Sequence, residues 1–238
     1  MLIYRKKVNF MNIEHVTMYA SNFETTKRFY ETTLKFPFIS ITHDRFTFKA
    51  GQTTVTFVKA PFAVQPFYHF AFDIPANQFE EAKAWTKEKI TLSQEQADDE
   101  VYFSGIDAKS IYFEDPAGNI VEFICRFTDA KRSNQRFTVA SLQKMSEMSI
   151  VVPNKLDAIR SLKTISVFER DNEEISTDGL SFMGDRKDAT YLLLVNEGRT
   201  WFFSNKKSTS FPVDISLNNG RIVKINEELQ LMSFVIRL

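Results

Sequence analysis

The chain has little cysteine: Cys125 is the only one among 238 residues. One thiol cannot form an intrachain disulfide, so the fold is expected to depend on its hydrophobic core and a reducing compartment is indicated. The first residues also lack the basic-then-apolar order of a secretory signal. We therefore expect a cytoplasmic protein.

Long apolar runs and an excess of one charge are missing as well. No run approaches the roughly 18 apolar residues that a membrane helix needs, so no membrane partner is expected. Lys and Arg together number 30, as do Asp and Glu. Such a balance produces no strong field that would attract nucleic acid, so no nucleic-acid partner is expected.

What is present is an internal repeat in the first half of the chain. Segments 15–22 and 69–77 each begin with His, alternate as a strand does and end at Asn. A helical pattern follows each segment, at residues 23–34 and 78–90, and β-like runs follow each helix. Each copy therefore predicts the order βαβββ, over about residues 12–60 and 66–127.

The second half resembles a worn copy of the same plan. Glu147 stands where the first copy has His15, Asp214 stands near the place of His69, and the turn at 218–220 replaces the last helix. The predicted elements are strands at 148–152, 190–195, 200–204, 213–217 and 233–238, with a helix at 156–162. A polar stretch at 129–134 suggests two modules, residues 1–130 and 131–238.

Two of the three histidines occupy matching places in the repeat. On a strand alternate side chains share a face, so His15 lies with Thr17, and His69 lies with Ala71 and Asp73. The opposite faces are apolar and suit the two helices. The faces that carry histidine are then expected to line the concave side of a sheet, although a lone strand histidine is often an ordinary structural residue.

Glu122 is an acid within the apolar strand 120–127. A buried carboxylate is costly unless it is paired or bound to a metal. Two imidazoles and one carboxylate, from His15, His69 and Glu122, would form a facial triad that leaves coordination positions open for a substrate. These three residues are the predicted metal ligands.

Tyr112 lies ten residues before Glu122, across the turn 115–119. In a regular hairpin it would face the same concave surface. Its hydroxyl could orient or protonate a substrate, which makes it the candidate catalytic residue. A packed core tyrosine is the alternative interpretation.

Two stretches resemble the vicinal-oxygen-chelate superfamily, which includes glyoxalase I, bleomycin-resistance proteins, fosfomycin-resistance enzymes and type I extradiol dioxygenases. They are His15 to Phe36, with Asn22-Phe23 before Phe29-Tyr30, and the hairpin Tyr112 to Glu122 around Asp115-Pro116-Ala117-Gly118-Asn119. The resemblance covers residues 12–127 and is faint over 140–238. It implies an α+β fold of tandem βαβββ repeats, which form U-shaped mixed β-sheets with helices on the outer faces.

The resemblance also implies His15, His69 and Glu122 as ligands of one divalent metal ion, Fe(II), Mn(II), Zn(II) or Ni(II). Extradiol dioxygenases carry a tyrosine where Tyr112 stands, and fosfomycin-resistance enzymes carry a threonine where Thr17 stands, which implies substrate binding by Thr17. The expected function is that of a metal-dependent enzyme that chelates a small oxygenated substrate, with dioxygenase-like ring cleavage as the sharpest version.

Several alternatives stay open at this point. A glyoxalase-like isomerase or a fosfomycin-resistance-like thiol transferase would use the same cation. A bleomycin-resistance-type protein would bind a small molecule without a metal, and a degenerate module could serve protein association. A homodimer is also compatible with the sequence, because the modules could pair within one chain or between two.

Overall fold

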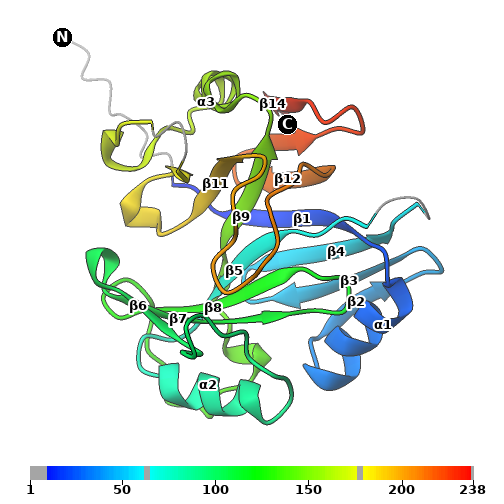
Figure 1. Cartoon of the computed structure of the whole chain (residues 1–238), viewed down its shortest axis with the longest axis vertical. Helices are drawn as coiled ribbons and strands as arrows, with labels where there is room; N and C mark the ends of the chain where they lie inside the picture. The colour runs from blue at the N-terminus through cyan, green and yellow to red at the C-terminus, as the bar shows by residue number, and fades with distance from the viewer. Residues whose placement is uncertain (1–9, 62–64, 176–178, 237–238) are drawn as a thin grey trace.

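The computed structural model describes residues 10–61, 65–175 and 179–236 and shows two seven-stranded mixed sheets with helices on their outer faces (Figure 1). The α+β class predicted from the sequence is confirmed. None of the helices in these ranges is long and apolar enough to cross a membrane.

The first sheet combines strands from both ends of the chain. Its order is β14 (Leu231–Val235), β13 (Arg221–Ile225), β12 (Val213–Leu217), β1 (Ile13–Ala20), β4 (Thr53–Lys59), β3 (Arg45–Ala50) and β2 (Phe38–Ile41). In its middle β1 is antiparallel to β12 and parallel to β4. The first repeat is therefore joined to the last part of the chain.

The second sheet combines the central parts of the chain. Its order is β10 (Ser181–Met183), β11 (Tyr191–Asn196), β9 (Lys144–Val152), β5 (His69–Asp73), β8 (Ile120–Arg126), β7 (Ala108–Glu114) and β6 (Val101–Phe103). In its middle β5 is parallel to β8 and antiparallel to β9. The second half of the chain carries the third repeat, which begins with β9, and the fourth, which begins with β12. The second repeat is therefore joined to the third, and each sheet draws on both predicted modules.

The helices form where the sequence places them. They are α1 (Phe23–Arg28), continued by the π-helical turn η1 (Phe29–Thr33), α2 (Phe79–Lys87) and α3 (Lys155–Thr164). Short 3-10 helices are η2 (Ser104–Ile106), η3 (Val139–Ser141), η4 (Arg170–Asn172) and η5 (Arg186–Asp188). No helix is described between β12 and β13, as expected from the turn at 218–220.

One hydrophobic core joins the helical faces of both sheets. It contains Val16 and Met18 of β1, Phe70 and Phe72 of β5, and Phe79 of α2. These strand residues are the apolar alternates of the residues that face the other way, as period-2 spacing requires. Because the apolar face of each strand is buried in the core, His15 and His69 lie on the other face of their sheets.

The strand expected at residues 200–204 is not formed. Residues 197–212, which we call the cover loop, instead leave β11, pass in front of β9 and β5, and return to β12 (Figure 1, orange). Phe203 has a positive φ of 54°, which an extended strand excludes. The apolar residues that suggested a strand are buried by contact with the second sheet.

Candidate metal centre

Three potential metal ligands meet on the second sheet. Ligand atoms of His69, Glu122 and Glu147 all lie within 4.8 Å of one another, and all three residues are buried. The Nε2 atom of His69 lies 3.5 Å from Oε2 of Glu122. The sequence predicted two of these residues as ligands.

Strand register explains how the two glutamates reach each other. Ala71 of β5 is paired with Glu122 of β8 on one side and with Glu147 of β9 on the other. The methyl group of Ala71 is the smallest side chain in that row, so both carboxylates extend across it. Tyr112 of β7 and Tyr191 of β11 complete the row at its two ends.

His15, the third predicted ligand, does not join this cluster. It lies in β1 of the first sheet, where its Nε2 atom is 2.8 Å from Oγ1 of Thr56. Burial and the nearby Lys49 ammonium lower the pKa of His15. Thr17, the predicted substrate ligand, lies in the same strand beside Thr56 and Asp214. The structure therefore groups His69 and Glu122 with Glu147, and the roles of His15 as a metal ligand and of Thr17 as a substrate ligand stay predictions.

Glu147 takes the place that the sequence assigned to His15. In the first sheet His15 of β1 pairs in parallel with β4 and antiparallel with β12. In the second sheet Glu147 of β9 pairs in parallel with β11 and antiparallel with β5. The two residues occupy equivalent repeat positions, but the second repeat pairs with the third and not with the first.

The protonation of His69 suits a metal ligand. Its Nδ1 atom lies 3.1 Å from the carbonyl oxygen of Ile120, and because a carbonyl can only accept, Nδ1 carries the proton. Burial lowers the pKa of His69 to about 4, so the ring is neutral at neutral pH. The lone pair on Nε2 then faces Glu122, the arrangement that a backbone carbonyl commonly supports in metal sites.

The two glutamates are held differently. Burial and the neighbouring Glu147 carboxylate raise the pKa of Glu122 to about 8. Burial also raises the pKa of Glu147, although Arg126 opposes the shift. The Arg126 guanidinium binds Oε1 of Glu147 and also pairs with Asp73. Arg126 therefore fixes Glu147 through one oxygen and leaves the other free.

The charges of the cluster do not balance by themselves. The cluster contains three buried acids, Asp73, Glu122 and Glu147. It contains two cations: Arg126, and Lys144 at the edge, whose ammonium lies 3.9 Å from the Asp73 carboxylate. At neutral pH a proton on Glu122 removes the remaining negative charge, as its raised pKa indicates. A bound cation would do the same, so the donor set and its charge fit a metal ion.

Tyr112 lies beside the cluster and stays protonated. Burial and the carboxylates of Glu122 and Glu147 raise its pKa well above the usual value. Its ring stacks on Phe203 of the cover loop, with centroids 4.7 Å apart and an interplanar angle of 12°. The predicted position of Tyr112 next to Glu122 is therefore present, while its catalytic role stays a prediction.

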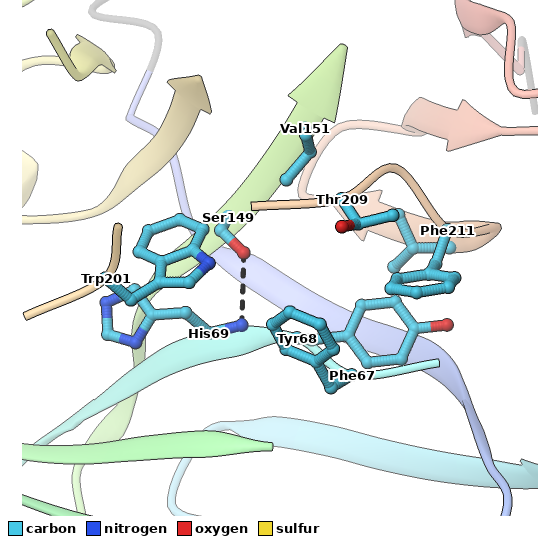
Figure 2. Close-up of a pocket in the computed structure, with 9 residues that line it drawn as sticks. Phe67, Tyr68, His69, Ser149, Val151, Trp201, Thr209 and Phe211 are labelled. Carbon is cyan, nitrogen blue, oxygen red and sulfur yellow. Dashed lines mark hydrogen bonds between the residues drawn. The ribbon is translucent and has the colours of Figure 1, made fainter. Parts of the chain in front are cut away.

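The cover loop closes the site from above. Figure 2 shows the indole of Trp201 beside the imidazole of His69, and their centroids are 5.1 Å apart. The backbone N–H of His69 donates to Oγ of Ser149 over 3.1 Å. Trp201 and Phe203 are both buried, and the cavity left beside His69 has a volume of about 10 Å³. That space holds about one water molecule.

Asp73, Arg126, Glu147 and Trp201 were not selected as site residues from the sequence. Period-2 spacing does place Asp73 on the face of His69, and Arg126 on the face of Glu122. A charged residue at the end of an apolar strand, on the face of a predicted ligand, could therefore have indicated Asp73 and Arg126 as site residues. No local signal indicates that Trp201 covers His69, because the two residues are distant along the chain.

Comparisons with known proteins agree with this architecture. Residues 12–123 match the family model described as Glyoxalase/Bleomycin resistance protein/Dioxygenase superfamily. Residues 145–199, which include Glu147, match the model described as Toxoflavin-degrading enzyme. No curated protein matches the chain by sequence.

Two solved structures are similar over nearly the whole chain. A putative dioxygenase from Bacillus subtilis subsp. subtilis str. 168 shares 11% identity at a TM-score of 0.59, over 94% of this chain and 84% of that chain. A glyoxalase I mutant from Zea mays shares 11% identity at a TM-score of 0.57, over 95% of this chain and 94% of that chain. At this identity the likeness shows a common fold.

Proposed function

Because residues 12–123 match the Glyoxalase/Bleomycin resistance protein/Dioxygenase superfamily, the family that the sequence resembles, we propose that the chain is a metal-dependent enzyme of this superfamily acting on a small oxygenated molecule. One divalent cation would be held by His69, Glu122 and Glu147. The observation that carries the proposal is the convergence of these three buried ligand atoms within 4.8 Å.

When bound, such a cation acts as a Lewis acid on substrate oxygens and stabilises the negative charge that develops on them. The residues of the chain supply the geometry. His69 presents Nε2 because Ile120 holds the Nδ1 proton, and Glu147 presents one oxygen because Arg126 holds the other. Tyr112 keeps its hydroxyl proton beside Glu122 and can donate it to a substrate oxygen.

The donor set bears on which reaction is favoured. Two histidines and one carboxylate are typical of non-haem Fe(II) oxygenases, whereas carboxylates suit harder ions such as Mn(II). The present set has one histidine and two carboxylates. We therefore place a Lewis-acid reaction on Mn(II), of the isomerase, lyase or transferase type, ahead of ring cleavage on Fe(II).

The test is metal content and affinity in the purified full chain. We expect about one Mn(II) per chain by elemental analysis, with binding weakened by at least about tenfold in Glu147→Gln and His69→Ala. His15→Ala is the matched control, because His15 holds the equivalent repeat position in the other sheet. Equal losses in His15→Ala would contradict the site.

Purified protein that contains no stoichiometric metal would favour the metal-free alternative, a small-molecule binder of the bleomycin-resistance type. Arg126 and Lys144 together offset the charges of Asp73 and Glu147, and a proton on Glu122 removes the third charge, so a metal-free chain would be a small-molecule binder whose buried acids are structural. Iron in place of manganese, together with oxygen uptake on a catechol, would restore the ring-cleaving alternative. Each outcome is distinguishable by the same elemental analysis.

A further inference from the structure

Phe211, near the end of the cover loop, borders two separate spaces. Its ring lines the small cavity beside His69 and also an open cleft of about 400 Å³, which we call the outer cleft. Tyr19 at the end of β1, Pro212 before β12 and Leu229 in the β13–β14 turn form its other walls. A space of this size holds a small organic molecule. None of the described lining residues is a proposed metal ligand, so the outer cleft has its own chemistry.

The walls of the outer cleft are held in place from behind by Tyr68. Its hydroxyl donates to the carbonyl oxygen of Pro212 over 2.7 Å and accepts from the backbone N–H of Tyr19 over 3.2 Å. The Phe211 ring packs edge-on against the Tyr68 ring, with centroids 6.2 Å apart (Figure 2). Because these contacts need no ligand, the outer cleft is formed in advance, which lowers the entropic cost of binding.

Leu229 supplies one wall from a backbone conformation that disfavours a bulky side chain. Its φ of 60° lies in the left-handed region, where glycine is preferred. The turn is closed by the N–H of Leu229, which donates to Asn226 over 3.0 Å, and by the N–H of Gln230, which donates to Oδ1 of Asn226 over 2.8 Å. Glycine would form the same backbone bond without strain. The leucine side chain is therefore explained by its contacts, which are the core and the outer cleft.

The walls are mostly apolar and offer few hydrogen-bond donors. Three of the lining residues are prolines, which have no backbone N–H. Ser210 also lines the space, but its N–H donates to Glu197 over 3.1 Å and its hydroxyl donates to the carbonyl oxygen of Val151 over 2.9 Å. An anion must be bound by donors or by cationic groups. The outer cleft is therefore poorly suited to an anionic ligand.

Glu227 is the only charged residue described in the lining of the outer cleft. The nearby Lys224 ammonium pairs instead with Asp214, at 3.0 Å. Asp214 is also the main cause of the raised pKa of Lys224, to which Glu227 contributes least. Within the described part of the chain Glu227 thus has no ion pair, and the outer cleft carries one negative charge beside two aromatic rings.

We propose that the outer cleft binds a small organic cation, which has a quaternary or protonated ammonium head and an apolar body. The head lies beside the rings of Tyr19 and Phe211, whose π electrons attract a cation, and is paired with the Glu227 carboxylate. The apolar body covers Leu229 and the prolines. This site holds no metal and does not rest on the function proposed above.

The probe is benzyltrimethylammonium, added to the chelator-treated full chain. We expect it to bind at least about tenfold more tightly than phenylmethanesulfonate, which carries the same benzyl group on a tetrahedral anionic head. Ligand-detected NMR titration at low ionic strength measures both dissociation constants. Because the two probes differ chiefly in the sign of their charge, equal affinities or tighter binding of the sulfonate would overturn the proposal.

Two substitutions locate the probe in the outer cleft. Glu227→Gln should weaken benzyltrimethylammonium binding at least about threefold, because it removes the carboxylate. Its matched control is Glu228→Gln, at the exposed neighbour that does not line the space. Tyr19→Leu, which keeps an apolar wall without a π face, should also weaken binding at least about threefold. Its control is Tyr102→Leu, on β6 of the second sheet.

Circular dichroism checks the fold of all four variants. If Tyr19→Leu loses the fold, the comparison of Glu227→Gln with Glu228→Gln still decides the site, because both glutamates are exposed. Equal affinity in Glu227→Gln and Glu228→Gln would overturn the proposal.

Glu147→Gln distinguishes the outer cleft from the metal centre. It should lose Mn(II) affinity, as expected above, and bind benzyltrimethylammonium as tightly as the unmodified chain does. Weaker probe binding in Glu147→Gln would place the cation at the buried acids and overturn this inference. A chain that takes up no Mn(II) but binds the probe loses only the proposed function, and a chain that takes up Mn(II) but not the probe loses only the outer-cleft site.

Discussion

Arg126 forms ion pairs with two of the buried carboxylates beneath the cover loop. It is buried, pairs with Asp73 and Glu147, and lies 3.1 Å from Oγ of Ser146. Burial alone would lower its pKa, but the carboxylates of Asp73 and Glu147 raise it overall, so the guanidinium stays charged. Its flat fork suits two carboxylates at once in a way that an ammonium does not.

Replacement of Arg126 by Met should therefore destabilise the chain strongly. Two buried carboxylates would lose their partner, which costs about 3–5 kcal/mol of unfolding free energy. Arg126→Lys, which keeps the charge but not the fork, should recover part of that loss. The measurement is urea unfolding of both variants, and equal stability of Arg126→Met and the unmodified chain would show that the acids find other partners.

His69 and Glu122 make the stability of the metal-free chain depend on pH in opposite directions. The pKa of folded His69 is depressed to about 4, so below its ordinary value of 6.5 the unfolded chain binds the proton first and stability falls as pH falls. The pKa of folded Glu122 is raised to about 8 from 4.5. Between those values the folded chain holds an extra proton, so stability falls as pH rises.

Glu122→Gln should remove the second dependence, because the amide resembles the protonated acid. In chelator-treated protein between pH 5 and 8, the unmodified chain should lose up to about 1.4 kcal/mol of stability per pH unit relative to Glu122→Gln. Thermal or urea unfolding at each pH measures it. Parallel curves for the two proteins would show that Glu122 is ionised in the folded chain.

At the scale of elements, the β3–β4 turn fixes where β9 begins. Gly51 has a positive φ of 57°, and a Cβ atom there would overlap the carbonyl oxygens of Leu142 and Gln143 just before β9. Gln52 N–H donates to Gln143 over 2.8 Å, and Oγ1 of Thr53 accepts from Met145 over 2.9 Å. This close approach places the strand that carries Glu147.

Gly51→Ala should therefore be costly although Gly51 is far from the metal ligands. Backbone strain and the overlap with two carbonyls predict a loss of about 2–4 kcal/mol in unfolding free energy. Gly105→Ala is the control, since nothing lies within 4 Å of a Cβ at that position. Urea unfolding compares the variants, and similar stability for both would mean that the turn moves without penalty.

The cover loop contains residues whose sequence pattern predicts a strand that the structure does not form. Residues 200–204 combine Trp201, Phe202 and Phe203, which favour a strand by propensity. The structure buries Trp201 and Phe203 on the second sheet and leaves Phe202 exposed. Alternation of buried and exposed residues is the same in a strand and in this loop, so only contact with the sheet distinguishes them.

At the scale of the whole molecule, the two predicted modules are interleaved. Two strands from the first half, β1 and β5, each lie at the middle of a sheet. Each has one neighbour from the second half: β1 lies beside β12, and β5 lies beside β9. Separate modules at residues 1–130 and 131–238 stay a prediction, as do a cytoplasmic location and a homodimer. The strand order makes the module prediction testable.

A fragment of residues 1–130 should not fold as the full chain does. It would expose the edges of β1 and β5, which lose the strands paired with them, and it lacks Glu147. We expect loss of cooperative unfolding by circular dichroism and of tight Mn(II) binding. A fragment that unfolds cooperatively and binds one metal ion would establish an independent first module.

The sequence by itself determined the repeat plan and the faces of its strands. Alternation separated Phe70 and Phe72 from His69, because burial of one face constrains residue types at period 2 or 3.6. Apolar periodicity predicted helices at 78–90 and 156–162, and the structure has them at 79–87 and 155–164. The sequence also determined that His69 and Glu122 face one surface, and it identified Glu147 as the counterpart of His15.

Only the tertiary structure decided which counterpart completes the cluster. Backbone hydrogen bonds between strands are the same for every residue type, so β5 can pair with any strand that the rest of the molecule brings to its edge. The packing of four repeats brings β9 there and leaves β1 in the other sheet. For the same reason the position of Trp201 over His69 follows from the path of the cover loop and from no local pattern.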